Sequence, residues 1–478
     1  MKQTLHFCPT NGFFGDTMPI KTEDGYHVFY NKLINGLTNK VGTLVWGHVY
    51  SPDLVHWEEM PDALKIGAPG TYDEKHCYSG SVIKKDDLYY IFYSGIQQDG
   101  TATVLKAVSR DLITWKQYDT EPLLLQPDEG YRKDGSWRDP CVFYHPGENC
   151  YWMFLTARSN TAGKDLYAGT IGLAKSVDLE HWTVYPPYWT PGISTVFECM
   201  DVFSYDAMWV MTYFWHETRC RMSDSPNGPW ERPRVEAPDY FDHFAGRTCP
   251  GENQKRILFG WIPRSEADGA KRIWGGNMAI PREWYLLPDK TPATKCAASV
   301  LAHARRNPVK NFVEELSLET GVWDRVETGW IHRGTEGGML LYEKTPPHFM
   351  FECRLRFKSR NSSASLMFRT NKVESKGAFA CVTDSGYKII FDSAEGLIRL
   401  REISEFDQKN DIAYIPYQLM AEEYIQVQLF VHKNMVELFV GNKKSLISRI
   451  LLFDKGEFAV HAQDGCIEMR DMKMYHLE

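Results

Sequence analysis

A short aromatic strand pattern that recurs five times is the feature that most constrains how this chain folds. Each copy follows a turn signal, and the copies are Asp24–Tyr30, Asp86–Tyr93, Asn149–Leu155, Asp206–Tyr213 and Lys255–Trp261. Aromatic and β-branched residues favour strands, and self-similarity along a chain is typical of repeat architectures. The repeats therefore predict five similar β-units.

A second element, Ser-x-Asp-Leu-x-x-Trp, is interleaved with the aromatic strands. It occurs at Ser51–Trp57, Ser109–Trp115 and Ser176–Trp182, with a looser copy at Ser223–Trp230, and the starts of neighbouring copies lie 47 to 67 residues apart. Units of this size that are rich in β-formers are typical of the blades of a β-propeller. We interpret Ser and Asp as turn-closing residues and Trp as a scaffold residue that fills the space between blades.

The predicted architecture is all-β, with a five-bladed β-propeller followed by a C-terminal β-sandwich. The propeller is expected over residues 1–287, and residues 288–308 form a predicted linker with a short helical stretch at Ala297–Ala304. Over residues 309–478, runs such as Phe351–Phe357 and Ile425–Val431 alternate between apolar and polar side chains. This alternation is typical of antiparallel strands that bury one face.

Charge and composition exclude several classes of protein. The chain has 54 Lys and Arg against 62 Asp and Glu, a net charge of −8, and no long basic run that would neutralise phosphates, so nucleic acid is not an expected partner. The polar N-terminus and the absence of an apolar stretch of about 18 residues predict neither export nor a membrane anchor. The 11 Cys include no C-x-x-C pair, so we expect reduced thiols, no metal site and a cytoplasmic location.

Three acids occupy similar places relative to the aromatic strands. Asp16, Asp139 and Glu198 precede the corresponding aromatic positions of the first, third and fourth repeats by 10, 12 and 11 residues. If the aromatic strand is the second strand of each blade, these acids lie in equivalent places on the innermost strands, and rotational repetition points them at one central pocket. In the second repeat, Ser79 and Ser81 take this place and offer hydroxyl groups to a ligand.

Carboxylates that converge on an aromatic-walled pocket suit the cleavage of a glycosidic bond. One acid must be protonated to release the leaving group, while another must be ionised to attack the sugar or to activate water. Neighbouring like charges push the pKa values of such acids apart, which supplies this division of labour. Taken singly, Asp16 also fits a turn, Asp139 an ion pair and Glu198 a solvent-facing strand, but their shared phase favours a glycoside hydrolase without metal or cofactor.

Several ordered blocks resemble glycoside hydrolase family 32, the group of invertases, inulinases and levanases. Trp137–Pro140 resembles its Arg-Asp-Pro motif, and Phe197–Cys199 resembles its Glu-Cys motif. Further blocks with similar family counterparts are His56–Leu64, Tyr78–Ser81, Phe259–Trp261, Trp274–Arg282, and Val436–Val440 with Ser448–Arg449. The resemblance covers nearly the whole chain and implies a five-bladed propeller joined to a sandwich that hydrolyses β-fructofuranosides with retention.

The resemblance also implies a role for each acid. Asp16 would be the nucleophile that attacks the anomeric carbon, Glu198 the general acid/base, and Asp139 the stabiliser of the transition state. The expected substrate is a short oligosaccharide that carries a β-fructofuranosyl or similar furanosyl group. The side chains that we expect to contact this sugar are Arg138, Ser79, Ser81, Phe14, Trp46 and Trp274.

The segment around Asp16 departs from the family pattern. Family members have Trp-Met-Asn-Asp-Pro-Asn-Gly, whereas this chain has Phe13–Pro19 with Gly15 in the place of the Asn, and Met200 replaces the usual Pro after the Glu-Cys motif. Gly15 offers no side chain to a sugar hydroxyl, and the loss of a polar partner in a buried site costs about 1–3 kcal/mol. We therefore expect weak activity on sucrose compared with another small fructoside or furanoside.

Two other functions remain compatible with the sequence. An arabinofuranosidase like those of the related propeller family 43 would act with inversion, which needs carboxylates about 6.5–9.5 Å apart rather than about 5–5.5 Å. A sugar-binding protein without turnover would also keep the pocket. Because binding alone does not require an acid/base pair, the presence of all three acids favours the hydrolase.

Overall fold

The computed structural model describes residues 2–34, 42–117, 121–266, 271–334, 336–371, 374–375, 381–382, 385–403 and 410–477. Within these ranges the chain consists of strands, one 3₁₀ helix, η1 (Asp165–Tyr167), and one α-helix, α1 (Ala298–Ala304). The prediction of an all-β chain is confirmed, and α1 lies where the sequence predicts a short helix. In the described part of the chain, neither helix has the length and apolar character that a membrane crossing requires.

Contacts divide the chain into two compact units. The first unit comprises Met1–Ala237, His243–Arg264 and Arg272–Pro292, and the second comprises Pro238–Asp242, Ser265–Lys271 and Ala293–Glu478.

The first unit is built from antiparallel sheets whose strands mostly follow one another in chain order. Three of these sheets are β6 (His76–Lys85), β7 (Leu88–Ile96), β8 (Ala102–Ser109) and β9 (Lys116–Gln117); β10 (Arg138–His145), β11 (Cys150–Arg158), β12 (Gly169–Ser176) and β13 (Thr183–Trp189); and β14 (Glu198–Tyr205), β15 (Met208–Trp215) and β16 (Glu217–Ser223). This up-and-down order agrees with the repeats in the sequence.

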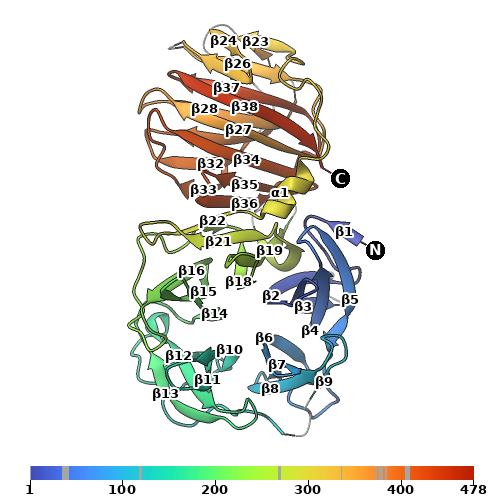
Figure 1. Cartoon of the computed structure of the whole chain (residues 1–478), viewed down its shortest axis with the longest axis vertical. Helices are drawn as coiled ribbons and strands as arrows, with labels where there is room; N and C mark the ends of the chain where they lie inside the picture. Colours follow the sequence, from blue (N-terminus) through green and yellow to red (C-terminus); the bar gives the residue numbers. More distant parts are fainter. Residues whose placement is uncertain are drawn as a thin grey trace. The chain divides into compact units, whose positions relative to one another are not determined.

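A larger sheet joins the start of the first unit to its end. Its order is β1 (Lys2–Thr4), β5 (His56–Leu64), β4 (Thr43–Ser51), β3 (Tyr26–Ile34), β2 (Phe13–Lys21), β20 (Arg272–Met278), β19 (Arg256–Ser265), β21 (Arg282–Leu286) and β22 (Pro292–Cys296), with β18 (Phe244–Pro250) paired to β19. The sheets of the unit surround a common centre, and β2, β6, β10, β14 and β18 are the innermost strands (Figure 1).

Pairing between β2 and β20 closes this arrangement. Phe14 of β2 pairs with Gly276 of β20. The segment before β2 adds two hydrogen bonds, because Met278 N–H donates to the Phe7 carbonyl (2.9 Å) and the Asn277 side-chain amide donates to the His6 carbonyl (3.1 Å). Strands from the start and the end of the unit are therefore held together by hydrogen bonds.

The repeated tryptophans pack between neighbouring sheets, as the sequence predicts. Trp115 contacts Phe29 of β3 and Trp182 contacts Phe92 of β7, each edge to face with ring centroids 5.5 Å apart. Trp57 of β5 contacts Phe259 of β19 in the same manner at 6.1 Å, so this third contact joins two distant strands of the one large sheet. These tryptophans are scaffold residues.

The turns that precede these tryptophans are closed by aspartate. In the first copy, Asp53 Oδ1 accepts hydrogen bonds from the backbone N–H groups of Val55 and His56, both at 2.9 Å. Asp111 and Asp178 accept equivalent pairs of bonds in the second and third copies. A short acceptor side chain that bonds to its own backbone two and three residues on is the usual chemistry of such turns.

The second unit contains two large sheets. The first is β17 (Asp239–Phe241), β36 (Lys444–Arg449), β35 (Met435–Val440), β34 (Tyr424–His432), β27 (Phe349–Phe357), β38 (Ile467–His476), β25 (Gly329–His332) and β24 (Trp323–Val326). The second is β23 (Leu318–Thr320), β26 (Gly338–Tyr342), β37 (Glu457–Asp464), β28 (Ser363–Asn371), β31 (Ser385–Asp392), β32 (Leu397–Ile403) and β33 (Asn410–Pro416), and the short pair β29 (Glu374–Ser375) and β30 (Cys381–Val382) is separate.

One hydrophobic core receives side chains from both large sheets of this unit. Leu355 of β27 and Leu429 of β34 belong to the same buried cluster as Leu366 of β28 and Ile389 of β31. Apolar faces that meet in one core are what period-two alternation in the sequence predicts.

Candidate active site

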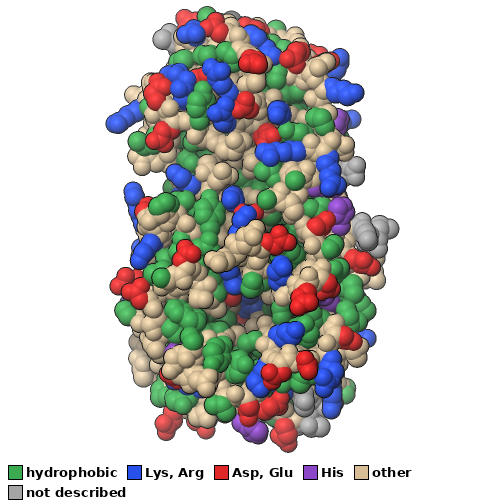
Figure 2. All heavy atoms as spheres, in the orientation of Figure 1, with side chains coloured by type: hydrophobic (Ala, Val, Ile, Leu, Met, Phe, Trp, Pro, Cys, Tyr) green, Lys and Arg blue, Asp and Glu red, His purple; other side chains and the backbone are tan. Residues whose placement is uncertain are grey.

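A cavity of about 140 Å³ lies among the innermost strands of the first unit. The space-filling view shows a hollow in the lower half of the picture, with acidic and basic side chains near it (Figure 2). The residues that line the cavity are Asp16, Asn31, Leu44, Tyr78, Ser79, Arg138, Asp139, Glu198, Cys199, Phe214 and Trp274. The structure therefore brings the three predicted acids together, along with Ser79, Arg138 and Trp274.

Each innermost strand carries a β-bulge. The pairing register shifts between Phe14 and Thr17 in β2, Tyr78 and Gly80 in β6, Arg138 and Cys141 in β10, Glu198 and Asp201 in β14, and Phe244 and Arg247 in β18. A bulge inserts one extra residue into a strand and turns the side chains around it away from their regular alternation. The bulges thus allow neighbouring side chains of one strand to reach the same cavity.

The pairing register shows that the three acids take different positions at the bulges of their strands. Asp16 and Asp139 lie inside the bulges of their strands, whereas Glu198 is still paired with Phe214 directly before the bulge. The expectation that the acids occupy strictly equivalent places is therefore wrong, because they share the level of the bulge but not the register position. Asp139 has a φ of 55°, a left-handed conformation that is uncommon for non-glycine residues and is often kept at functional sites.

Asp16 has both carboxylate oxygens hydrogen bonded. The Ser79 hydroxyl donates to Oδ2 (2.8 Å), and the Trp261 indole N–H donates to Oδ1 (2.9 Å). Burial raises the pKa of Asp16, and the Asp139 charge raises it further, while the two hydrogen bonds and the Arg247 charge act in the opposite direction. These contacts fix the orientation of the carboxylate.

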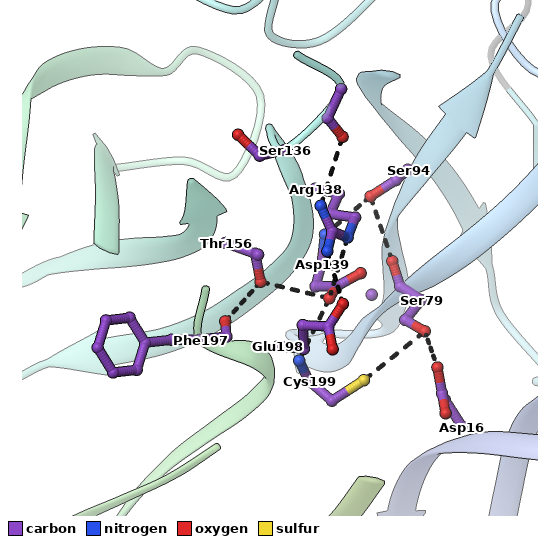
Figure 3. A network of polar contacts seen from close by, with 12 residues as sticks. Asp16, Ser79, Ser94, Ser136, Arg138, Asp139, Thr156, Phe197, Glu198 and Cys199 are labelled. Carbon is purple, nitrogen blue, oxygen red and sulfur yellow. Dashed lines mark hydrogen bonds and ion pairs between the residues drawn. The ribbon is translucent and has the colours of Figure 1, made fainter. Parts of the chain in front are cut away.

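Asp139 is almost fully buried, with 4% of its surface exposed. Its Oδ2 accepts a hydrogen bond from the Cys199 backbone N–H (3.2 Å) and lies 3.3 Å from the Thr156 hydroxyl, while its own backbone N–H donates to Ser94 Oγ (2.9 Å). These contacts come from three different sheets (Figure 3). They leave the side chain little freedom to move, which suits a group that must act on a bound sugar without reorganising.

Glu198 forms an ion pair with Arg138 across the cavity. Arg138 Nη2 lies 2.6 Å from Glu198 Oε1, and Arg138 Nε lies 3.9 Å from Asp139 Oδ2 (Figure 3). Burial raises the pKa of Glu198, the Arg138 charge lowers it, and the Asp139 charge raises it, with a net increase. A carboxyl group with a raised pKa is suited to donate a proton near neutral pH.

Sequence reasoning missed a second layer of polar residues beneath the acids. Asn31, Ser94 and Thr156 lie on the second strands of their sheets, and Asn31 Oδ1 lies 2.6 Å from Ser79 Oγ. Each of the three directly follows the aromatic run of its strand, as in Tyr93-Ser94. A polar residue that recurs at this point of the repeat is a signal that was present in the sequence.

The structure does not bring Phe14, Trp46 or Ser81 into the lining of the cavity. Phe14 is fully buried and stacks on Tyr30 with ring centroids 4.3 Å apart. Trp46 is fully buried and donates its indole N–H to the Tyr78 carbonyl (2.9 Å), and Ser81 Oγ accepts the Val142 backbone N–H (3.0 Å). All three residues support the strands that carry the site.

A model of a known protein family matches the part of the chain that contains this site. The sequence model described as "Glycosyl hydrolases family 32 N-terminal domain" matches residues 6–295, which is more than half of the chain. The chain belongs to glycoside hydrolase family 32. The matched region contains every residue that lines the cavity.

Characterised family 32 proteins are similar over different shares of their length. Sucrose-6-phosphate hydrolase of Bacillus subtilis (strain 168) is 26% identical over 326 residues, which cover 60% of this chain and 64% of that protein, just under two thirds of it. Raffinose invertase of Escherichia coli is 27% identical over 506 residues, covering 99% of this chain and 94% of that protein. Among solved structures, exo-inulinase from Aspergillus awamori has a TM-score of 0.73 with 18% identity and covers 99% of this chain and 98% of its own.

The departure of this family 32 chain at Gly15 has a structural reason. A Cβ atom placed on Gly15 would lie 2.2 Å from Trp274 Cη2 and 2.9 Å from the Asn31 carbonyl oxygen. Real Cβ atoms do not approach other atoms so closely. The Trp274 indole therefore occupies the space that the side chain of an Asn at position 15 would need, and it lines the cavity there instead.

Proposed function

We propose that this protein hydrolyses β-fructofuranosides in short oligosaccharides. The single observation that carries the proposal is the convergence of Asp16, Asp139 and Glu198 on one cavity in a chain that belongs to family 32. The named relatives support this substrate class, because they include a sucrose-6-phosphate hydrolase and a raffinose invertase. The oligosaccharide is the expected partner, and the oligomeric state is open.

The proposed mechanism is a double displacement with retention. Asp16 attacks the anomeric carbon of the fructofuranosyl group, and Glu198 protonates the leaving oxygen. Water then hydrolyses the glycosyl-enzyme intermediate, with Glu198 as the general base. Asp139 stabilises the positive charge that develops on the ring in each transition state. The hydrogen bonds to both oxygens of Asp16 support its role, because they aim the carboxylate in one direction.

Proton NMR of the reaction tests substrate and mechanism together. The substrates are sucrose, inulin-type and levan-type oligosaccharides and aryl arabinofuranosides, and the anomer that is released first is recorded. Release of β-fructofuranose from at least one fructoside is the expected result. Release of the inverted anomer, or hydrolysis of arabinofuranosides alone, would replace the proposal with the inverting alternative, and binding without turnover would replace it with a sugar-binding protein.

We infer that the first unit is a five-bladed β-propeller and that the second contains a β-sandwich. Five innermost strands, each with a bulge, support the count of five blades. The proposed boundaries are 1–287 for the propeller, 288–308 for the linker and 309–478 for the sandwich.

We also retain a cytoplasmic location as a prediction, to be tested by cell fractionation.

Replacement of Asp139 by Asn should lower kcat by about 10²- to 10³-fold and change KM only slightly. Positive charge develops on the sugar ring in the transition state, so the carboxylate stabilises that state more than the ground state. Steady-state kinetics on the best fructoside separate the two constants. If the variant raised KM alone, Asp139 would be a binding residue without a part in the chemical step.

Replacement of Gly15 by Ala should reduce kcat/KM by at least about tenfold on every substrate. The added Cβ collides with the Trp274 indole, which must move away from the cavity wall, and small displacements in a reacting site are costly. Gly163→Ala is the matched control, because a Cβ at that glycine meets nothing within 4 Å. Activity equal to that of the control would show that Trp274 shifts without affecting the sugar site.

A further inference from the structure

A buried arginine lies next to the site without lining it. Arg247 follows the bulge of β18, pairs with Phe259 of β19, and has only 3% of its surface exposed. Its Nη1 donates a hydrogen bond to the Gly80 carbonyl in the bulge of β6. The side chain thus connects two innermost strands that are 167 residues apart in the chain.

The rest of this guanidinium has no hydrogen-bond partner. Arg247 Nε and Nη2 are both buried, and neither finds an acceptor among the residues that the structure describes. Buried charged donors without acceptors are rare, because a charge that leaves water must be compensated by opposite charge or by hydrogen bonds. Nearby negative charges must therefore compensate the buried charge of Arg247.

The compensation comes from the acids of the cavity. Burial lowers the pKa of Arg247, but the negative charges around it, those of Asp139 and Asp16 among them, raise it, with a net increase, so the side chain stays charged. Burial raises the pKa of the neighbouring Cys199 thiol, which is therefore neutral near pH 7 and leaves the compensation to the aspartates. In return, the Arg247 charge lowers the pKa of Asp16, against the effects of burial and of Asp139. The contact with Gly80 also holds the residue next to Ser79, whose hydroxyl donates to Asp16.

We propose that Arg247 is a positioning residue for the reaction, whose buried charge keeps Asp16 ionised and whose bond to Gly80 fixes the bulge that carries Ser79. This inference rests on the proposed function, because Asp16 must be ionised only if it is the nucleophile. Arg247 itself is not among the residues that line the cavity, so it acts through Asp16 and Ser79 rather than on the sugar.

Two variants separate the charge of Arg247 from its shape. Arg247→Gln removes the charge, and Arg247→Lys keeps it. Asp16 faces Asp139 from β10, Glu198 and Cys199 from β14, and Arg247 from β18, and the glutamine variant changes only the last of these. The acidic limb of the pH profile of kcat/KM, which reports the ionisation of the free nucleophile, should therefore move upward by about one pH unit in the glutamine variant and return toward its original position in the lysine variant.

A second readout does not depend on turnover. Carbon-13 NMR of protein labelled at the aspartate carboxyl carbons follows the titration of Asp16, whose resonance is assigned as the one lost in Asp16→Asn. Because the Arg247 charge lowers the pKa of Asp16, we expect this midpoint to rise by about one unit in Arg247→Gln and to return toward the wild-type midpoint in Arg247→Lys. If no fructoside were hydrolysed while this shift occurred, the proposed function would fail and the electrostatic role of Arg247 would stand.

Arg369→Gln is the matched control. Arg369 is also 3% exposed, donates only to main-chain carbonyls and leaves its Nε without a partner among the described residues, but it belongs to the second unit. The substitution Arg369→Gln should lower thermal stability without moving the acidic limb of the pH profile of kcat/KM. A folded Arg247→Gln protein with an unchanged limb, or with reduced stability alone, overturns the proposal. A wild-type Asp16 that is still protonated at the pH of maximal kcat/KM overturns it even if neither Arg247 variant folds.

Discussion

Asp16→Asn should lower kcat by about 10⁴-fold or more while the fold and sugar binding are retained. The substitution removes the attacking charge with little change in shape, and the loss of a nucleophile is among the largest effects that a single substitution has on an enzyme. The amide can still contact the Ser79 hydroxyl and the Trp261 indole that orient the carboxylate in the wild type. Initial rates on the best fructoside and calorimetric binding of the same sugar measure the two effects separately.

Asp73→Asn provides the control for this experiment. Asp73 is buried, as Asp139 is, accepts a hydrogen bond from the Tyr93 hydroxyl (2.7 Å), and is not among the residues that line the cavity. It should affect stability and leave the rate within a few fold of the wild type. If both variants lost activity equally, or if Asp16→Asn kept near wild-type turnover, the assignment of the nucleophile would be wrong.

Glu198→Gln should be the second most damaging substitution, and its effect should depend on the leaving group. We expect kcat/KM for oligosaccharides to fall by about 10³-fold, whereas an aryl fructoside, whose phenolate leaves without a proton, should lose far less. The two substrates act as controls for each other on one protein. Equal losses on both would show that Glu198 is not the acid, and restored turnover of the glycosyl-enzyme by azide would support its second role as base.

The pH profile supplies an independent check on Glu198. The reaction requires Asp16 ionised, so activity appears as pH rises through its pKa, and it requires Glu198 protonated, so activity is lost as pH rises through the pKa of Glu198. Burial raises both pKa values. The wild type should therefore show a bell-shaped profile, and Glu198→Gln should lose the alkaline limb with the aryl substrate because its amide does not titrate.

Much of the scaffold is predictable because its signals are local. The aromatic strands and the Ser-x-Asp-Leu turns each lie within a few residues of sequence, so their periodicity and turn chemistry indicate strands directly. The contacts of Trp57, Trp115 and Trp182 follow from the same repeat, because equivalent positions pack in equivalent ways. The acids were found by their phase within this repeat.

The details of the site are not predictable in the same way. A bulge changes the pairing register by one residue, and one residue moves a side chain to the other face of a strand, so spacing alone cannot separate Phe14, which is buried, from Asp16, which lines the cavity. The burial of Trp46 depends on neighbours from distant parts of the chain. Arg247 has no local signal at all, because an arginine in a strand usually faces solvent.

During synthesis, β2 must wait for its partner strand β20. Asn277, which bonds to the His6 carbonyl, is synthesised 271 residues after it, which at typical elongation rates is a delay on the order of 15–50 s. During that time β2 has an open edge, and open edges tend to pair with other chains. Charged side chains on an edge strand oppose such pairing, so we expect the carboxylate of Asp16 to disfavour association of nascent chains along this edge.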